Sequence, residues 1–379
     1  MSDVDHRVHG VGPEDVVPDW PPLQADELEV LLADYPAFAA GPHRIAWHSP
    51  RPLSAAALVD TARGRVFVKR HHVSVRTAAC LEEEHRFIAH LHGKGLPVVE
   101  VFADAHGHTA VTRGDWTYEV HSTGLGEDVY RQTTSWTPLT DLARAREAGA
   151  MLARLHQAAA DDHAPQRSTH VLVARDDLLR AEDPIVALQA QFAERPALRA
   201  WLQSRDWQRD FARDLLPWHA GLATRLRDTP RLWAHNDWHV SNLLWQREGD
   251  ALRISGVLDF GLASPTSAMF DLATAIERNA IAWLTLETGF DAVHLQTACA
   301  LIAGYREVLP LDAASVQLLA DLLPLVHLEF ALSEVEYFHA ITGSPDNAAV
   351  AYDVFLLGHA RWFASAPGQA LLQAIRATA

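Results

Sequence analysis

The chain has 379 residues, of which 49% are hydrophobic and 21% charged, so it can bury a large core in two domains or one large bilobal domain. Its formal net charge of −16 argues against nucleic acid or an anionic membrane as the main partner, because both would repel an acidic surface. Cys80 and Cys299 show no CxxC or Cys/His pattern, which indicates neither a disulfide framework nor a zinc site. The chain starts without a signal-peptide pattern and has no run of about 18 apolar residues, so we expect a cytoplasmic protein.

The first third of the chain predicts short strands and one helix. Residues 1–22 carry four prolines among Asp, Glu and Gly, and we expect a flexible lead-in there. Residues 23–115 are expected to form a small β-rich lobe, because apolar residues alternate around 66–68 and 109–112. An apolar stripe over roughly 77–92 predicts a helix that ends at the glycines before a proline.

The rest of the chain predicts a larger helical part. We expect a hinge at 116–122, followed by a mainly helical lobe over 123–379 that is interrupted by strands and loops between 231 and 261. The 12 tryptophans are scattered, as is typical of core packing, and the sequence shows no internal repeat. The fold class is therefore predicted as α+β and bilobal, with a small antiparallel β lobe, one helix in it, and a larger helical lobe.

A pattern of polar residues in the second half carries the chemistry. Residues 233–244 contain His235, Asp237 and Asn242 in the spacing H-x-D-x-x-x-x-N, and Asp259-Phe260-Gly261 follows. Kinases combine such a catalytic loop with a metal-binding Asp-Phe-Gly. Phosphoryl transfer needs a carboxylate to accept or orient the attacking hydroxyl, and hard oxygen ligands for Mg²⁺. Asp237 fits the first task, whereas Asn242 and Asp259 fit the second; the alternative is a surface loop with capping residues.

A lysine and a glutamate of the small lobe complete the predicted kinase chemistry. Val66-Phe67-Val68-Lys69 has the form of the strand that carries the phosphate-binding lysine. Of the three acids at 82–84, only Glu84 falls on the apolar stripe of its helix. An inward carboxylate needs a partner, and Lys69 is the natural candidate. We therefore expect a Lys69–Glu84 pair that orients the amine toward ATP.

These residues resemble the aminoglycoside phosphotransferase / choline kinase-like family, which has a protein kinase-like fold. The resemblance extends over most of the chain and includes residues 95–98, 149–156 and 270–273. It implies ATP and Mg²⁺ as cofactors. It also implies a structural part for His235 in the catalytic loop, catalysis by Asp237, and a supporting role for Asp271 under that loop.

Two segments depart from the family pattern. Asn236 stands where the family usually has glycine, which suggests an asparagine in a left-handed conformation. The expected nucleotide loop at 49–56 lacks a glycine-rich pattern, so phosphate binding would use Ser54, Arg51 or main-chain amides. Adenine is expected to bond to the hinge at Glu119 and Val120.

Three functions remain open on the sequence. Only nine residues separate Gly261 from Asp271, and there is no Ala-Pro-Glu, so the peptide platform of a protein kinase is missing. This favours a small-molecule hydroxyl acceptor over the alternatives of a bacterial Ser/Thr protein kinase or a nucleotide-binding pseudokinase regulator.

The acceptor is specified less sharply than the reaction. Glu329 and Glu336 share a helix face and could bind a cationic amine, although a solvated face is the alternative; Glu277 and Arg278 are further candidates. An amino-sugar, amino-alcohol or hydroxy-amino acid would suit the negative charge. The sequence does not specify the oligomeric state, a preference for ATP over GTP, or a role in antibiotic resistance.

Overall fold

The computed structural model describes residues 6–131, 133–134, 136–249 and 251–379. Contacts divide the chain into two compact units. The N-terminal unit contains the residues up to Gly126 together with Ser255–Leu258, and the C-terminal unit contains Glu127–Ile254 and Asp259–Ala379.

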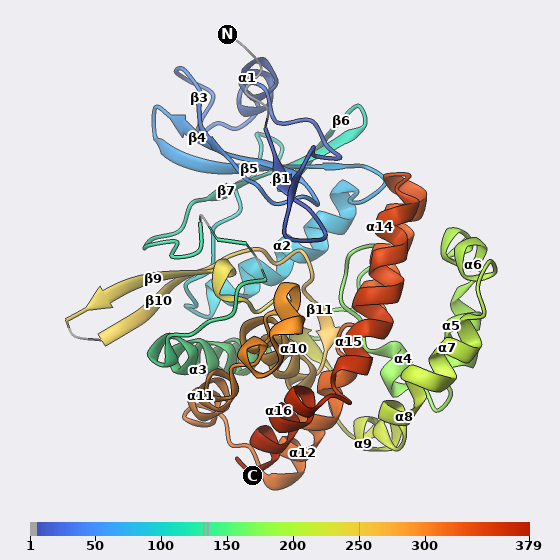
Figure 1. The fold of residues 1–379 in the computed structure, drawn as a ribbon. Coiled ribbons are helices and arrows are strands. Elements are labelled where there is room, and N and C mark those ends of the chain that lie inside the picture. The colour runs from blue at the N-terminus through green and yellow to red at the C-terminus, as the bar shows by residue number, and fades with distance from the viewer. Residues whose placement is uncertain (1–5, 132, 135, 250) are drawn as a thin grey trace. The chain divides into compact units, whose positions relative to one another are not determined.

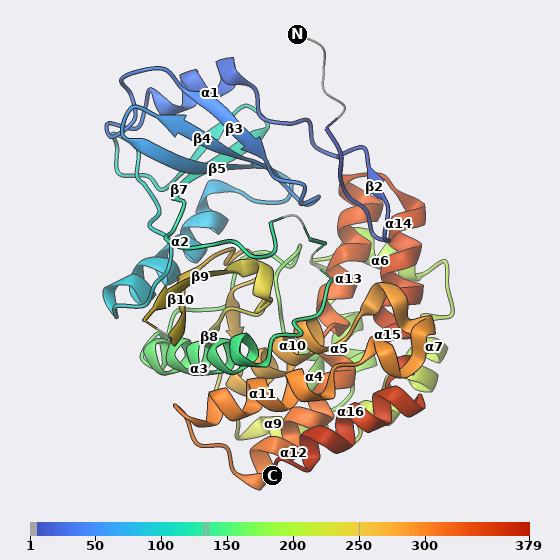
Figure 2. The same cartoon turned by 60° about the vertical axis from the view of Figure 1, so that its left-hand side comes forward.

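The N-terminal unit is built around one antiparallel sheet of five strands in the order β3-β4-β5-β7-β6. Two helices accompany this sheet, and Figures 1 and 2 show both beside it. The elements are β1 (Val8–His9), β2 (Asp15–Val16), α1 (Ala25–Leu32), β3 (Arg44–His48), β4 (Ala55–Thr61), β5 (Gly64–His72), α2 (Ala78–Gly93), β6 (Ala110–Arg113) and β7 (Trp116–Ser122).

The two faces of this sheet have different roles, because side chains alternate along a strand. One face carries Val66, Val68, Tyr118 and Val120, which pack with the leucines of α1 in an apolar core. On β5 and β7 the opposite face is polar, and its register places Lys69 directly across from Glu119. This register sets the positions of the polar side chains described below.

Helix α2 forms where the sequence predicts it. The Thr77 side chain caps its start by accepting a hydrogen bond from the Cys80 N–H at 3.2 Å. The predicted apolar stripe is buried, and so is Glu84, which is 2% exposed. The inward position of this carboxylate is therefore confirmed.

The lead-in predicted for residues 1–22 contains more structure than expected in its described part, residues 6–22. Strands β1 and β2 pair with each other, and the His9 N–H donates to the Pro50 carbonyl at 2.8 Å. Arg51 Nη1 lies 3.4 Å from His9 Nδ1. A main-chain hydrogen bond and a side-chain contact of His9 thus fasten this segment to the expected nucleotide loop, which proline content alone did not indicate.

The C-terminal unit is mainly helical, with two small antiparallel strand pairs, β8 with β11 and β9 with β10. Its helices are α3 (Leu142–Ala159), α4 (Asp177–Arg180), α5 (Pro184–Gln191), α6 (Pro196–Leu202), α7 (Trp207–Asp214), α8 (Leu216–His219), α9 (Leu222–Arg227), α10 (Ala268–Ala280), α11 (Leu295–Arg306), α12 (Ala313–Leu322), α13 (Leu328–Glu336), α14 (Pro345–Val350), α15 (Leu357–Trp362) and α16 (Ala366–Arg376). The strands are β8 (Leu232–Ala234), β9 (Leu243–Glu248), β10 (Ala251–Val257) and β11 (Ser264–Thr266), and the tighter or wider helical segments are η1 (Val240–Asn242), η2 (Trp283–Ala292), η3 (Leu323–Leu325), η4 (Tyr337–Ile341) and η5 (Ala351–Leu356).

One helical stretch of this unit, Ala313–Ile341, is long and apolar enough to cross a membrane by length and composition, and its apolar window has a mean hydropathy of 1.4. Its apolar window is 83% buried inside the structure. Such burial is typical of a core helix, which passes the same test by length and composition.

Helices α3 and α11 approach each other through two glycines. A Cβ atom at Gly149 would lie 2.0 Å from the Leu301 carbonyl oxygen, and one at Gly304 would lie 1.8 Å from the Arg146 carbonyl oxygen. Any larger residue at either position must push the two backbones apart. This close crossing fixes the neighbouring residues of both helices relative to each other.

We therefore expect Gly304→Ala to lower the free energy of unfolding by about 1–3 kcal/mol, the usual cost of overpacking. Urea unfolding followed by circular dichroism would measure the change. Gly93→Ala is the control, since in the described part of the chain nothing lies within 4 Å of a Cβ added there. Equal stability of Gly304→Ala and wild type would contradict the close crossing.

Candidate functional site

Asp237 and Asn242 face each other across the loop between β8 and β9. The Asn242 side-chain amide donates to the Asp237 carbonyl oxygen at 2.9 Å and to its Oδ2 at 3.2 Å. The Asp237 N–H donates to His235 Nδ1 at 3.2 Å. The three polar residues of the motif therefore form one connected loop, as their spacing predicted.

A fully buried carboxylate, Asp271, holds this loop from below. Its two oxygens accept the main-chain N–H groups of His235 at 3.0 Å and of Asn236 at 2.8 Å. Asp271 lies in the first turn of α10, which Ser267 caps by accepting the Phe270 N–H at 3.2 Å. This contact is the supporting position that the family resemblance implied for Asp271.

Asp271 is itself held by residues of α3 and α11, the two helices that approach each other at Gly149 and Gly304. His156 of α3 places Nε2 3.0 Å from Asp271 Oδ2, and its Nδ1 lies 2.9 Å from the hydroxyl of Tyr305 on α11. His156 and Tyr305 are 3% and 1% exposed. The orientation of the Asp271 carboxylate thus depends on the packing of α3 against α11.

Asn236 adopts the left-handed conformation that its place in the motif suggested, with φ of 60°. Its buried side chain donates to the Ser264 carbonyl at 3.1 Å and accepts the Thr266 hydroxyl at 2.7 Å. Asparagine tolerates positive φ better than most residues. Here it also links the loop to β11, which a glycine could not do.

A second side chain of α10 supports the loop and was missed on the sequence. Asn279 donates to the Trp238 carbonyl at 2.7 Å and accepts the Val240 N–H at 3.0 Å. It lies eight residues after Asp271, so both project from one face of the helix. That spacing is the only sequence signal that could have identified it.

Arg278, a weaker candidate from the sequence, forms an ion pair with Asp237. Its Nε lies 3.0 Å from Asp237 Oδ1, and the two side chains are 12% and 19% exposed. Burial raises the pKa of Asp237, and the positive charge of Arg278 opposes this rise. The guanidinium therefore favours the ionised carboxylate.

The Asp-Phe-Gly motif follows β10 directly. Asp259 is exposed and has a φ of 53°, and its charge also raises the pKa of Asp237, less than burial does. Phe260 is 1% exposed, and its ring centroid lies 4.8 Å from that of His235. The motif and the loop are thus packed together through an aromatic contact.

The polar face of the N-terminal sheet carries the second predicted group. Lys69 is half-buried on β5, and Glu84 lies on the buried side of α2. His85, beside Glu84, places Nε2 2.7 Å from Glu119 Oε2, so α2 packs on the sheet face that carries Lys69. The proximity required for a Lys69–Glu84 pair is therefore supported, and the pair itself stays a prediction.

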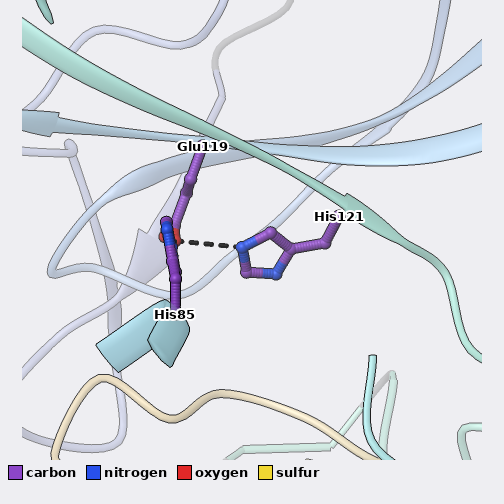
Figure 3. Close-up of side chains that lie close together, drawn as sticks. All are labelled: His85, Glu119 and His121. Carbon is purple, nitrogen blue, oxygen red and sulfur yellow. Dashed lines mark hydrogen bonds and ion pairs between the residues drawn. The ribbon is translucent and has the colours of Figure 1, made fainter. Parts of the chain in front are cut away.

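Glu119 is the centre of a cluster of imidazoles. His121 and His71 lie 3.0 and 3.1 Å from its oxygens, in addition to His85, and Figure 3 shows His85 from α2 facing Glu119 and His121 from β7. Burial would raise the pKa of Glu119, but His121, His71 and His85 hold it well below its usual range. This side chain is thus part of a closed hydrogen-bonded group.

The structure corrects the predicted hinge. Residues 116–122 form β7, in which Glu119 and Val120 pair with β5 at the centre of the sheet. Main-chain groups used in a sheet are unavailable to adenine. The chain leaves the sheet after Ser122 and the C-terminal unit begins at Glu127, so 123–126 is the better position for a hinge. Ser54 lies just before β4, in the loop that was expected to hold phosphate.

The acidic candidates for acceptor binding are all buried, so the solvated-face alternative is wrong for α13. Glu329 accepts the Leu178 N–H at 3.0 Å, and Glu336 pairs with Arg195 Nε at 2.9 Å. Burial raises the pKa of Glu329 to about 8 and also raises that of Glu277, which is 1% exposed. Glu329 and Glu336 fasten α13 to α4 and to the start of α6.

Comparisons with known proteins identify a family for this chain. The phosphotransferase enzyme family (APH) matches residues 53–311. A homoserine kinase from Methylobacterium radiotolerans is 37% identical over 109 residues, which are 29% of this chain and 31% of that kinase. The match thus spans about a third of that kinase's length.

Solved structures show the fold. The amicoumacin kinase hAmiN, in complex with AMP-PNP, Ca²⁺ and Ami, has a TM-score of 0.56 at 16% identity. The alignment covers 93% of this chain and 92% of the kinase chain. A microcompartment-associated aminopropanol kinase has a TM-score of 0.56 at 17% identity, covering 92% of this chain and 100% of its own. The predicted α+β, protein kinase-like fold is therefore confirmed.

The family match covers more than half of the chain and includes the loop, the Asp-Phe-Gly motif and Asp271. The protein therefore belongs to the APH phosphotransferase enzyme family.

Proposed function

We propose that this protein is a cytoplasmic kinase that moves the γ-phosphate of Mg-ATP to a hydroxyl group of a small molecule. The observation that carries the proposal is the loop in which Asp237 faces Asn242 while Asp271 holds the loop backbone. A carboxylate, a hard-oxygen ligand and a fixed backbone in one loop are the parts that phosphoryl transfer requires.

Asp237 orients the acceptor hydroxyl and takes its proton. The hydroxyl oxygen forms a bond to the γ-phosphorus as the bond from that phosphorus to the β,γ-bridging oxygen breaks, and ADP leaves with that electron pair. Arg278, 3.0 Å from Asp237 Oδ1, opposes the rise in the pKa of Asp237 and so favours the ionised form that accepts the proton. General base catalysis of this kind contributes roughly 10²–10⁴-fold to the rate.

The residues present fit a magnesium ion. The Asn242 NH₂ group is used by Asp237, which leaves its Oδ1 as an oxygen ligand, and Asp259 adds an exposed carboxylate. When bound, Mg²⁺ neutralises charge on the phosphates. In the proposal, Lys69 binds the α- and β-phosphates and Glu84 orients its amine.

Three observations support a small acceptor with an amino group. After Gly261 the chain enters β11, which pairs with β8, and α10 starts at Ala268, so there is no long activation segment. The net charge of −16 favours cationic ligands. The similar proteins named above include kinases of homoserine and aminopropanol. An amino-alcohol, hydroxy-amino acid or amino-sugar is the acceptor class we propose.

A screen tests this function directly. Purified protein with Mg-ATP would be offered amino-alcohols, hydroxy-amino acids, amino-sugars and a mixed peptide substrate, and ADP release and the phosphorylated product would be measured. We expect transfer to one of the small hydroxylated amines. Transfer to peptides alone, or nucleotide binding without transfer to any acceptor, would contradict the proposal.

For Asp237→Asn we expect kcat to fall about 10²–10⁴-fold, because the variant has no base at this position. Nucleotide affinity, measured by calorimetry, should stay within a few-fold of wild type. Asp228→Asn is the control, since Asp228 is exposed in the same unit. Undiminished turnover by a folded Asp237→Asn protein would show that Asp237 is not the base.

For Arg278→Gln we expect the acid limb of the profile of kcat against pH to move to higher pH. Asp237 works only when ionised, burial already raises its pKa, and removal of the guanidinium removes the opposing charge. Arg278→Lys keeps a positive charge and should shift the limb less. An acid limb at the wild-type pH in Arg278→Gln would contradict the coupling.

For Glu329→Gln we expect a weaker dependence of stability on pH. The folded-state pKa of about 8 lies above the usual 4.5, so the native state keeps a proton that the unfolded chain releases, and stability falls as pH rises from about 5 to 8. Glutamine keeps an oxygen for the Leu178 N–H and does not titrate. Urea unfolding at pH 6 and pH 8 measures the difference, with exposed Glu287→Gln as the control. A wild-type slope in Glu329→Gln would contradict the raised pKa.

A further inference from the structure

A second polar cluster of the C-terminal unit is separate from the loop. Glu277 of α10 meets His327, at the start of α13, and His359 of α15. Its Oε1 lies 3.8 Å from His327 Nδ1 and 3.7 Å from His359 Nδ1. All three side chains are buried, with exposures between 2% and 6%, and their ligand-type atoms lie within 4.8 Å of one another.

Hydrogen bonds satisfy this cluster poorly: the Trp283 side chain is close enough to Glu277 to oppose the rise in its pKa, but not in the geometry of a normal hydrogen bond. Across residues 136–249 and 251–379, no hydrogen bond of normal geometry reaches either oxygen of Glu277 or the Nδ1 of His359. A buried polar group without a partner costs about 1–3 kcal/mol, and a buried charge costs more. Glu277 and His359 therefore both carry buried polar atoms that would gain from a bound cation between them.

The imidazole cluster around Glu119 provides an internal comparison. There the histidine nitrogens lie 2.7–3.1 Å from the carboxylate oxygens, which is hydrogen-bond distance (Figure 3). Around Glu277 the corresponding separations are 3.7 and 3.8 Å. The first cluster is closed by hydrogen bonds, whereas the polar atoms of the second lie beyond hydrogen-bond distance of one another.

Both histidine rings are held in place from behind. His359 stacks on Trp283, with ring centroids 3.6 Å apart and an angle of 13° between the planes. On the other side of the His327 ring, Glu334 Oε2 lies 3.5 Å from Nε2. A carboxylate behind an imidazole is the usual arrangement that orients a metal-ligating histidine.

We propose that Glu277, His327 and His359 form a binding site for a divalent transition metal of the zinc class. Tetrahedral Zn²⁺ has ligand bonds of about 2.0–2.2 Å, so its ligand atoms lie roughly 3.4 Å apart. For the two carboxylate–imidazole pairs, the observed 3.7 and 3.8 Å require an inward shift of only a few tenths of an ångström, and the ligand atoms of the two histidines lie within 4.8 Å of each other. Imidazole with carboxylate suits zinc rather than magnesium, which prefers oxygen ligands.

The spacing distinguishes a metal from the ammonium group of an acceptor. An ammonium donates hydrogen bonds of about 2.9 Å, so its acceptor atoms lie roughly 4.7 Å apart in tetrahedral geometry. The two measured separations are about 1 Å shorter than that. The site lies next to Arg278 on the same helix, so the bound metal would fix the end of α10 that carries this partner of Asp237.

The experiment uses the full chain and does not depend on catalysis. Chelator-treated protein would be titrated with Zn²⁺ and with Co²⁺ in the presence of a competing chelator, because the chain has 22 histidines that bind metals weakly. We expect one tight metal per chain, a rise in melting temperature, and the visible absorption of tetrahedral Co²⁺.

Variants assign the site. Glu277→Gln and His359→Gln should lose the tight metal and the Co²⁺ spectrum, with folding checked by circular dichroism. Asp259→Asn, which alters the proposed magnesium site, and His108→Gln, at an exposed histidine 3.6 Å from Glu82, should keep both.

The proposal would be overturned by wild-type protein that binds no stoichiometric Zn²⁺ or Co²⁺, or by tight binding that survives in both Glu277→Gln and His359→Gln. It would also be overturned if amines, and not metals, stabilised wild type and this effect disappeared in Glu277→Gln. None of these outcomes depends on the phosphotransfer reaction, so the metal site and the proposed function can fail separately.

Discussion

The candidate site depends on one buried carboxylate, that of Asp271. It has no access to solvent, yet it accepts two loop N–H groups and contacts a histidine, so its burial is compensated by directed hydrogen bonds. Because these bonds end on the backbone beside Asp237, they fix the position of the proposed base. The close contact of α3 and α11 affects this position indirectly, because it places His156 and Tyr305, and His156 contacts Asp271.

Helix α10 is the common element behind the site. Its last turn provides Glu277, Arg278 and Asn279, and its first turn provides Asp271. Each of these four side chains has a different role. Asp271 holds the loop backbone, and Arg278 pairs with Asp237. Asn279 donates to the Trp238 carbonyl of the loop, and Glu277 lies in the second polar cluster. A helix is a suitable support because its residues are fixed relative to one another by the 3.6-residue repeat.

The sequence predicted what local patterns determine. The strands, the buried stripe of α2, the inward Glu84 and the left-handed Asn236 follow from periodicity and backbone preference, and the loop motif follows from its spacing. The clusters around Glu119 and Glu277 join residues from distant segments, so no local pattern reveals them, and for Asn279 the only signal is its spacing of eight residues from Asp271. The hinge was misplaced because a strand at the centre of a sheet and a connecting segment can carry similar residues.

The short segment Ser255–Leu258 has a consequence for how the chain is assembled. It belongs to the N-terminal unit although it follows 128 residues of the other unit, and there the Val257 N–H donates to the Pro97 carbonyl at 2.7 Å and the Ser255 hydroxyl to the Leu125 carbonyl at 2.6 Å. The polypeptide therefore passes from one unit to the other three times. Neither unit is formed by one continuous segment of the polypeptide, so a fragment ending at Gly126 would lack Ser255–Leu258 of the N-terminal unit. On the ribosome, the first unit can be completed only after about half of the second has been synthesised.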